Sequence, residues 1–153
     1  TSLETLIASS LCGTLSQNKI GELSENLALQ RNLVEGNQGR KSFFELDNEF
    51  HYILYQAARK EETYKMVRRM CYQVDRVRYY MIPRANLTQH MLESHRMILE
   101  CIIQGEKERL TEILQDHIND VFSHDGKPAA FAVNLLETHP EYFSNVPQDL
   151  GKR

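Results

Sequence analysis

Apolar residues recur at spacings of three and four along most of the chain, which is typical of helices that bury one face. Phe43, Phe50 and Leu54 follow this spacing, for example. Glycine and proline interrupt helices, and those at positions 39, 83, 105 and 126 leave helix-length intervals between them. The pattern predicts six main helices and one short one. Their expected ranges are about 2–16, 19–35, 40–58, 62–82, 87–104, 106–123 and 129–137.

The interval between Gly39 and Pro83 is too long for one helix of a small domain, because it would extend for about 60 Å at about 1.5 Å per residue. We therefore expect a break at the charged run at residues 59–62. No stretch alternates apolar and polar residues as a strand does, and no Asn-Gly hairpin signal lies between two such stretches. The expected fold class is all-α, an antiparallel bundle of six to seven helices.

Composition places the chain among ordinary single-domain globular proteins. It has 153 residues, of which 41% are hydrophobic and 25% charged, and a formal net charge of −3. This charge argues against a bare nucleic-acid-binding surface, and three widely spaced cysteines argue against a disulfide framework. We expect one domain at residues 1–138, followed by a C-terminal tail at residues 139–153.

Neither a membrane span nor a signal peptide is expected. The sequence has no run of about 18 apolar residues and no charged segment followed by a short apolar one. The predicted localisation is therefore cytoplasmic. Because the first residue is Thr1 and not methionine, we expect the chain to belong to a longer protein with a further segment on its N-terminal side.

Four polar residues interrupt the apolar stripes of the predicted helices. Asp47 and His51 stand four positions apart on the stripe of the third helix, so they are neighbours on one face. His95 lies at the centre of the stripe of the fifth helix, and His117 has the same place in the sixth. All four side chains are expected to point inward. The other three histidines are expected to face solvent; they are His90, His124 and His139.

A turn at Gly105 would join the last two main helices as an antiparallel hairpin. His95 lies 10 residues before Gly105 and His117 lies 12 residues after it. At about 1.5 Å per residue, the two histidines then differ in level by only about 3 Å. Three imidazoles and a carboxylate that converge in a bundle core suit Zn²⁺, Ni²⁺, Fe²⁺ or Mn²⁺, and leave two positions of an octahedral ion open.

Two other interpretations of these residues stay open at this point. In the first, the histidines are core residues bonded to carbonyl groups, and Asp47 with His51 is a helix pair in a structural bundle. In the second, the cluster activates water in a mononuclear metalloenzyme. The sequence contains no His-Glu-x-x-His or Glu-x-x-His pair, which argues against the metalloenzymes that use them. The high cost of an unpaired buried carboxylate favours a metal ion.

The same residues resemble the GntR family of bacterial transcription regulators, in the FadR-type branch whose all-helical C-terminal domain is called FCD. That family has an Asp-x-x-x-His motif in one helix, a Glu-x-His or Glu-His motif in another, and a histidine 22 residues further on. Asp47 and His51 match the first motif, His95 matches the second, and His117 follows 22 residues later.

Other segments extend this resemblance, with one departure. The Gly-Glu turn at residues 105–106 stands where the family usually has Gly-Asp. Ser94 stands between Glu93 and His95, so the acidic residue is not directly adjacent to the histidine as it is in the Glu-His form of the motif. Segments 43–47 and 74–79 are further similar to repressors of starvation-sensing, sugar-acid dehydratase operons.

The resemblance implies an effector-sensing domain and not an enzyme. A winged helix-turn-helix on the N-terminal side, absent from this chain, would bind operator DNA, while this chain would bind the effector and form a homodimer. The implied ligands of a divalent metal are Asp47, His51, His95 and His117, with Zn²⁺ or Ni²⁺ expected before Mn²⁺ or Fe²⁺. The implied effector is a small carboxylate, such as a sugar acid, bound beside the metal.

Arg78 is the residue we expect to bind the rest of such an anion. At about 100° per residue, it lies about 40° from the centre of the apolar stripe of the fourth helix, whereas Arg76 points about 160° away. Arg78 is therefore expected in the effector pocket. In the alternative, its guanidinium neutralises a core acid such as Asp47, or its stem covers apolar surface while its head reaches water.

Overall fold

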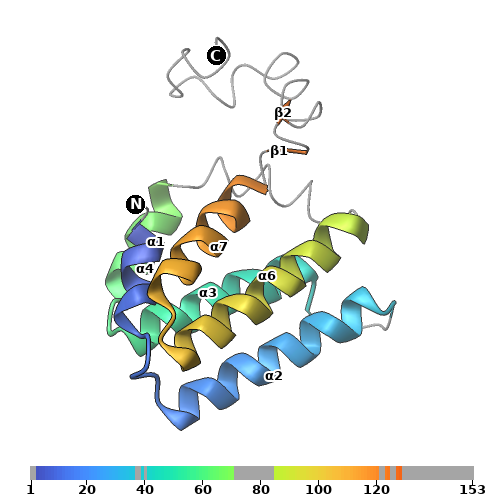
Figure 1. The fold of residues 1–153 in the computed structure, drawn as a ribbon. Coiled ribbons are helices and arrows are strands. Elements are labelled where there is room, and N and C mark those ends of the chain that lie inside the picture. The colour runs from blue at the N-terminus through green and yellow to red at the C-terminus, as the bar shows by residue number, and fades with distance from the viewer. Residues whose placement is uncertain are drawn as a thin grey trace. The chain divides into compact units, whose positions relative to one another are not determined.

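The computed structural model describes residues 3–36, 39, 41–70, 85–120, 123–124 and 127–128. The chain divides into two units, Thr1–Val121 and Phe122–Arg153. In the described part of the first unit every element is a helix, which confirms the predicted all-α fold (Figure 1). The six helices described there are α1 (Leu3–Ser10), α2 (Gln17–Val34), α3 (Phe43–Ala57), α4 (Glu61–Met70), α6 (Ala85–Gln104) and α7 (Lys107–Asp120).

The described residues of the second unit form one short antiparallel pair. Strand β1 (Ser123–His124) pairs with β2 (Lys127–Pro128), and Ser123 lies opposite Pro128. Strands of two residues are too short to give an alternating pattern, so the sequence did not indicate them. The domain boundary expected after residue 138 lies outside the described residues and stays a prediction.

The first helix is shorter than predicted, because α1 ends at Ser10 and not near residue 16. A turn follows in which Gly13 has a φ of 71°, a left-handed conformation that glycine adopts without steric cost. The Gly13 N–H donates to the carbonyl of Ile102 at 2.8 Å. The end of α1 is therefore held by a contact with a distant helix, which local sequence does not reveal.

The break predicted at residues 59–62 is confirmed. Helix α3 ends at Ala57 and α4 begins at Glu61, with Arg59 between them at a φ of 55°. Helix α4 is described as far as Met70. The remainder of the fourth predicted helix, to residue 82, and the helix predicted at 129–137 lie outside the described residues.

Specific caps fix the helices that carry the polar residues. Ser42 and Glu45 form a capping box at the start of α3, in which the Ser42 hydroxyl accepts from the Glu45 N–H and the Glu45 carboxylate accepts from the Ser42 N–H. At the end of α6, Gly105 has a φ of 79° and the N–H of the next residue, Glu106, donates to the Cys101 carbonyl. The turn predicted at Gly105 is confirmed, and it sets the levels of α6 and α7.

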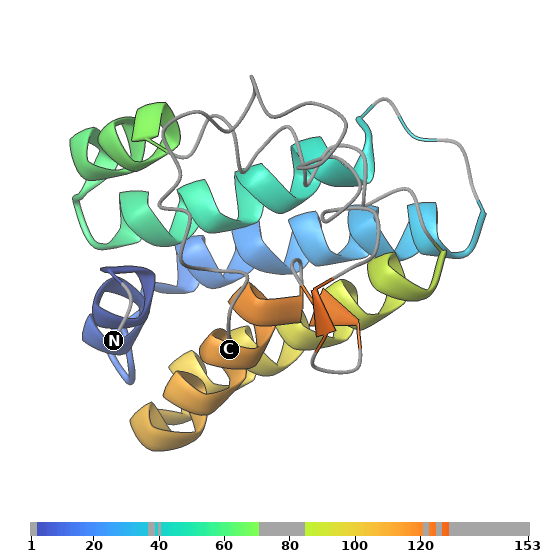
Figure 2. The same cartoon turned by 90° about the horizontal axis from the view of Figure 1, so that it is seen from above.

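Helix packing in the first unit gives one continuous core. Helix α2 packs against α3 and α6, and α7 packs against α6 and α1. Figure 2 shows α2 beside α3, with α6 and α7 forming the neighbouring hairpin. The fully buried apolar side chains include Phe50, Leu54, Ile98, Leu110 and Leu114, from α3, α6 and α7. Among the described residues, none of the helices has the length and hydrophobicity that crossing a membrane requires.

We predict that Leu54→Ala lowers the free energy of unfolding by about 2–5 kcal/mol, because Leu54 is 0% exposed and its removal leaves a cavity. The matched control is Leu29→Ala on α2, where the side chain is 45% exposed and the expected change is within about 0.5 kcal/mol. Urea denaturation followed by circular dichroism measures both. Equal effects of the two substitutions would contradict this description of the core.

Candidate metal centre

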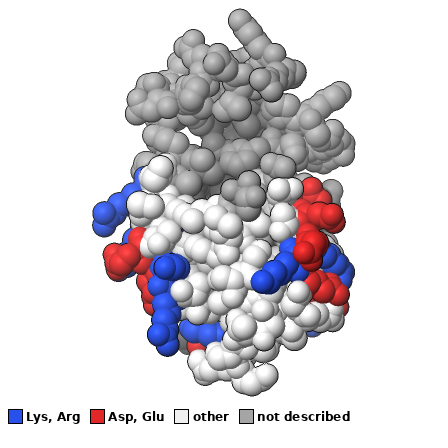
Figure 3. All heavy atoms as spheres, turned by 60° about the vertical axis from the view of Figure 1, so that its left-hand side comes forward, with Lys and Arg blue, Asp and Glu red and all other residues white. Residues whose placement is uncertain are grey.

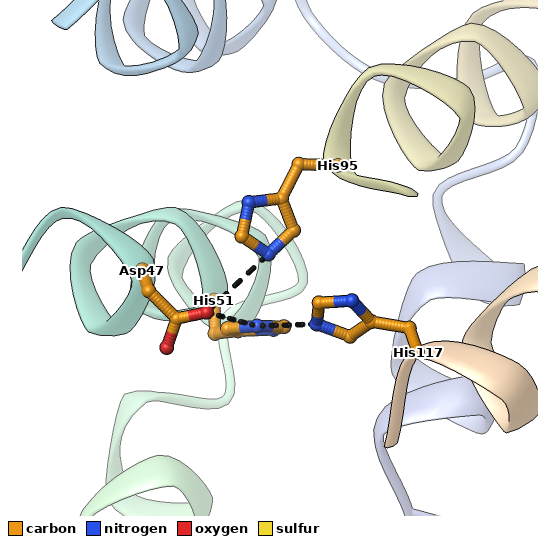
Figure 4. Close-up of side chains that lie close together, drawn as sticks. All are labelled: Asp47, His51, His95 and His117. Atoms are coloured by element: carbon orange, nitrogen blue, oxygen red, sulfur yellow. Dashed lines mark hydrogen bonds and ion pairs between the residues drawn. The ribbon is translucent and has the colours of Figure 1, made fainter. Parts of the chain in front are cut away.

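The four polar residues on the predicted helical stripes lie together in the core. Asp47 and His51 come from α3, His95 from α6 and His117 from α7, and all four side chains are buried (Figure 4). One ligand atom of each residue lies within 4.8 Å of those of the other three. The inward orientation expected from the spacing of three and four is therefore found at each of these positions.

Three distances between facing atoms come near those expected around a common ion. Asp47 Oδ1 lies 3.7 Å from His51 Nε2 and 3.5 Å from His95 Nε2, and His51 Nε2 lies 3.3 Å from His117 Nε2. Two ligands bonded at about 2.1 Å to one metal ion are separated by about 3.0 Å at right angles and by about 3.4 Å at the tetrahedral angle. Three imidazole nitrogens and one carboxylate oxygen also match the ligand preferences of Zn²⁺ and Ni²⁺.

Helix geometry and an aromatic ring hold these side chains in place. Asp47 and His51 are one helical turn apart on α3, so both reach the same point from one face. Phe50, on the same helix, stacks on the His95 ring at a centroid distance of 4.3 Å and an interplanar angle of 19°. The stacking orients the imidazole of His95 and supplies an apolar wall at that side of the cluster.

Glu4 of α1 is an acidic neighbour of this cluster that the sequence did not indicate. Its carboxylate hydrogen-bonds to His51 Nδ1. A carboxylate only accepts, so Nδ1 carries the proton and the opposite nitrogen, Nε2, presents its lone pair to the cluster when the ring is neutral. Burial alone lowers the pKa of His51, but the charge of Glu4 and the hydrogen bonds that the ring donates to Asp47 and Glu4 raise it to about 9 in the metal-free chain.

The Glu4 carboxylate changes the charge expected at the site. A dication with three neutral imidazoles and Asp47 retains about one positive charge, but Glu4 brings a second negative charge to the far side of His51. The cluster and its hydrogen-bonded neighbour together are then about neutral. With Glu4 included, the site therefore has little excess positive charge, and this charge alone gives little reason for it to bind an anion.

His95 is held by a chain of amides on α2. Gln30 Oε1 lies 2.8 Å from His95 Nδ1, and Gln30 Nε2 donates to Asn26 Oδ1 at 2.7 Å. Asn26 Nδ2 in turn donates to the carbonyl of Leu46 at 3.0 Å. Asn26 and Gln30 are four residues apart on the buried side of α2, the same spacing that singled out Asp47 and His51, and so this signal was present in the sequence.

The other candidate residues do not join the cluster in the described part of the chain. Arg78 lies outside the described residues, and its place in an effector pocket stays a prediction. His90 is exposed on α6, as expected. The side chain of His124 and all of His139 are likewise outside the described part.

A surface groove of about 520 Å³ is a separate feature of the described residues. All of its lining residues come from α2 and α6, and they include Arg31, Arg96 and Ile103. None of the four cluster residues lines it. The groove is therefore separate from the cluster of Asp47, His51, His95 and His117.

The fold and the cluster define an all-α domain with potential metal ligands from three helices at its centre. A family model described as FCD domain matches residues 1–120, and the chain belongs to this family. The resemblance to the effector-binding domain of GntR-type regulators is confirmed, whereas the narrower resemblance to starvation-sensing repressors stays a prediction.

Curated relatives are HTH-type transcriptional regulators by name. The chain is 24% identical over 119 residues to the HTH-type transcriptional repressor RspR of Escherichia coli K12, an alignment that covers 78% of this chain and 52% of that protein. The same identity and coverage relate it to the HTH-type transcriptional regulator YdfH of Shigella flexneri. The chain thus spans about half the length of the curated relatives it matches. No solved structure matches the chain.

Proposed function

We propose that this chain is the effector-sensing domain of a DNA-binding transcription regulator and that it binds one divalent metal ion. The proposed ligands are Asp47, His51, His95 and His117. The observation that carries the proposal is the convergence of their four ligand atoms within 4.8 Å in the buried core of an FCD domain. Membership of this family and the regulator names of the relatives favour a sensor over a metalloenzyme.

Zn²⁺ or Ni²⁺ is the proposed metal, with Mn²⁺ or Fe²⁺ as alternatives, because imidazole-rich sites suit the first two best. An octahedral ion held by four protein ligands would keep two positions open. A bound divalent ion would supply a Lewis acid for a carboxylate oxygen. The chain itself supplies the ligand geometry and, through Glu4, the orientation of one imidazole.

The proposed effector is a small carboxylate, such as a sugar acid. Because Glu4 and Asp47 together offset the charge of a dication, preference for an anion depends on an open coordination position and on a cation elsewhere in the pocket. We propose that Arg78 is this cation. It would bind the remaining charge or hydroxyl groups of the effector.

The remaining parts of the proposal concern the whole protein. The operator DNA would be bound by a winged helix-turn-helix on the N-terminal side of this chain, in the cytoplasm. This chain, with its domain at residues 1–138, would form the homodimer. The relatives fit this division, since their names describe helix-turn-helix regulators and the chain matches about half of their length.

An apolar surface on α1 and α4 is our candidate for the dimer interface. Figure 3 shows the side of the molecule on which these helices lie in Figure 1, and the charged side chains there stand apart with uncharged residues between them. The exposed large apolar side chains of the two helices are Leu3, Leu6, Met66 and Met70. Exposed large apolar side chains are a common feature of protein–protein contacts.

We predict that the chain, purified without chelator, contains about one divalent ion per molecule by elemental analysis. His117→Ala should lower metal affinity by more than the roughly 10- to 100-fold typical of a change in an outer hydrogen-bond partner, because a direct ligand is lost. His90→Ala, an exposed histidine on α6, is the matched control and should leave affinity unchanged.

Chelator provides the second measurement for this prediction. It should lower the melting temperature of the wild-type chain and of His90→Ala, because removal of a bound metal removes the stabilisation that its binding gives to the folded state. The melting temperature of His117→Ala should stay unchanged, because this variant has no bound metal to lose. A metal-free preparation that added Zn²⁺ or Ni²⁺ does not stabilise would show that the cluster is structural.

Sugar acids should raise the melting temperature of the metal-loaded chain more than the matched neutral sugars do, and chelator should abolish the difference. We expect Arg78→Ala to weaken acid binding about tenfold or more, the contribution of one charge-assisted hydrogen bond. Arg31→Ala, which alters the groove between α2 and α6, is the control and should bind normally. Equal stabilisation by neutral sugars, or by acids in the metal-free chain, would refute an effector anchored on the metal.

Sedimentation analysis at tens of micromolar should give a dimer. Met66→Lys places a charge on the proposed face and should shift the chain toward monomer, because a buried charge without a partner is costly. Leu29→Lys, at an exposed apolar position of α2, should leave the dimer intact. Monomeric wild-type protein would contradict the dimer, and a dimer unaffected by Met66→Lys would place its interface elsewhere.

A further inference from the structure

We propose that Asn26 and Gln30 are positioning residues that hold His95 with its proton on Nδ1, so that Nε2 presents a lone pair to the cluster. This inference rests on the proposed function in so far as it concerns metal affinity. The protonation state of the His95 ring is a property of the metal-free chain as well. Three hydrogen bonds, from α3 through α2 to α6, carry the argument.

We call these three hydrogen bonds, from Leu46 through Asn26 and Gln30 to His95, the relay. It begins at a group that can only accept a hydrogen bond. The backbone carbonyl of Leu46 only accepts hydrogen bonds, and Asn26 Nδ2 lies 3.0 Å from it. The same nitrogen lies 3.3 Å from the carboxylate of Glu49, a second acceptor. The amide of Asn26 is therefore fixed with its nitrogen toward α3 and its oxygen toward Gln30.

The orientation of Asn26 passes to the next amide. Asn26 Oδ1 only accepts, so the group 2.7 Å from it is the Nε2 of Gln30. The oxygen of Gln30 then faces His95 and lies 2.8 Å from Nδ1. Because an amide oxygen requires a donor, Nδ1 bears a proton, and in the neutral ring Nε2 is then the acceptor, directed at Asp47 and the other histidines.

Burial makes this polarity difficult to reverse. Gln30 and His95 are 0% exposed, and Asn26 is buried as well. A flipped Gln30 amide would put its NH₂ group against His95 Nδ1 and its oxygen against Asn26 Oδ1. Water does not reach the pair to compensate, and each buried polar group that loses its hydrogen bond costs about 1–3 kcal/mol.

His51 and His95 are thus oriented by different means. His51 is held by a carboxylate from α1, whereas His95 is held by a neutral relay anchored on the backbone of α3. The anchor, Leu46, directly precedes Asp47 in the chain. Helix α2 supplies no ligand atom, and in this assignment it determines which nitrogen of His95 is able to bind a metal.

The first experiment is nitrogen-15 NMR of the histidine rings in the chelator-treated chain. In the wild type we expect His95 to be protonated at Nδ1. Gln30→Met keeps the length of the side chain but removes the acceptor, and should release the ring to the Nε2–H form. Gln17→Met, an exposed position on the same helix, is the matched control and should leave the His95 signals unchanged.

The second experiment is competition for Zn²⁺ against a chromogenic chelator. Gln30→Met and Asn26→Leu should each weaken binding about 10- to 100-fold, the range found for outer hydrogen-bond partners of metal-bound histidines. Asn26→Asp should rescue the loss, because a carboxyl oxygen still accepts from Gln30 and its protonated form still donates to Leu46. Asn18→Leu, at an exposed position of α2, is the control for the leucine substitution.

The outcomes separate this inference from the metal proposal. A His95 ring that is protonated at Nε2 and not at Nδ1 in the wild type overturns the relay, whether or not a metal binds. A wild type that binds metal, with Gln30→Met and Asn26→Leu within twofold of it, overturns the positioning role. A chain that binds no metal but shows the expected proton on Nδ1 refutes the proposed function and supports the assignment of the His95 proton.

Discussion

The Asp47 carboxylate, buried at 0% exposure in an otherwise apolar core, is the constraint on which the rest of the site depends. A charge in that position is costly unless an opposite charge balances it, and ring nitrogens of His51 and His95 lie 3.7 and 3.5 Å from its Oδ1. The position of Asp47 is set by the capping box that begins α3, and that of His95 by α6, which ends just before Gly105. The ends of these two helices thus determine where the charged and polar groups of the core meet.

Most of the fold and the four cluster residues could be predicted because they follow from local periodicity. A helix places residues three and four apart on one face, and a hairpin turn brings equal levels together, so Asp47, His51, His95 and His117 were found without knowledge of the packing. Glu4 could not be found this way. Its role depends on α1 lying against α3, which is a property of the tertiary structure.

The relay through Asn26 and Gln30 and the end of α1 show why the sequence did not reveal every feature. Asn26 and Gln30 interrupt an apolar face just as Asp47 and His51 do, so their burial was predictable, but nothing local tells which histidine they contact. The end of α1 depends on the bond from Gly13 to the Ile102 carbonyl, a contact between distant parts of the chain. In both cases the deciding partner is remote in sequence.

Chain topology gives the cluster a late place in folding. The hydrogen bonds that join His51 to Glu4, His95 to Gln30 and His117 to His51 span 47, 65 and 66 residues. Closing loops of this length costs entropy before any contact rewards it, whereas the helices themselves form from neighbouring residues. The cluster and its outer hydrogen bonds are therefore complete only once α1, α2, α3, α6 and α7 have all docked.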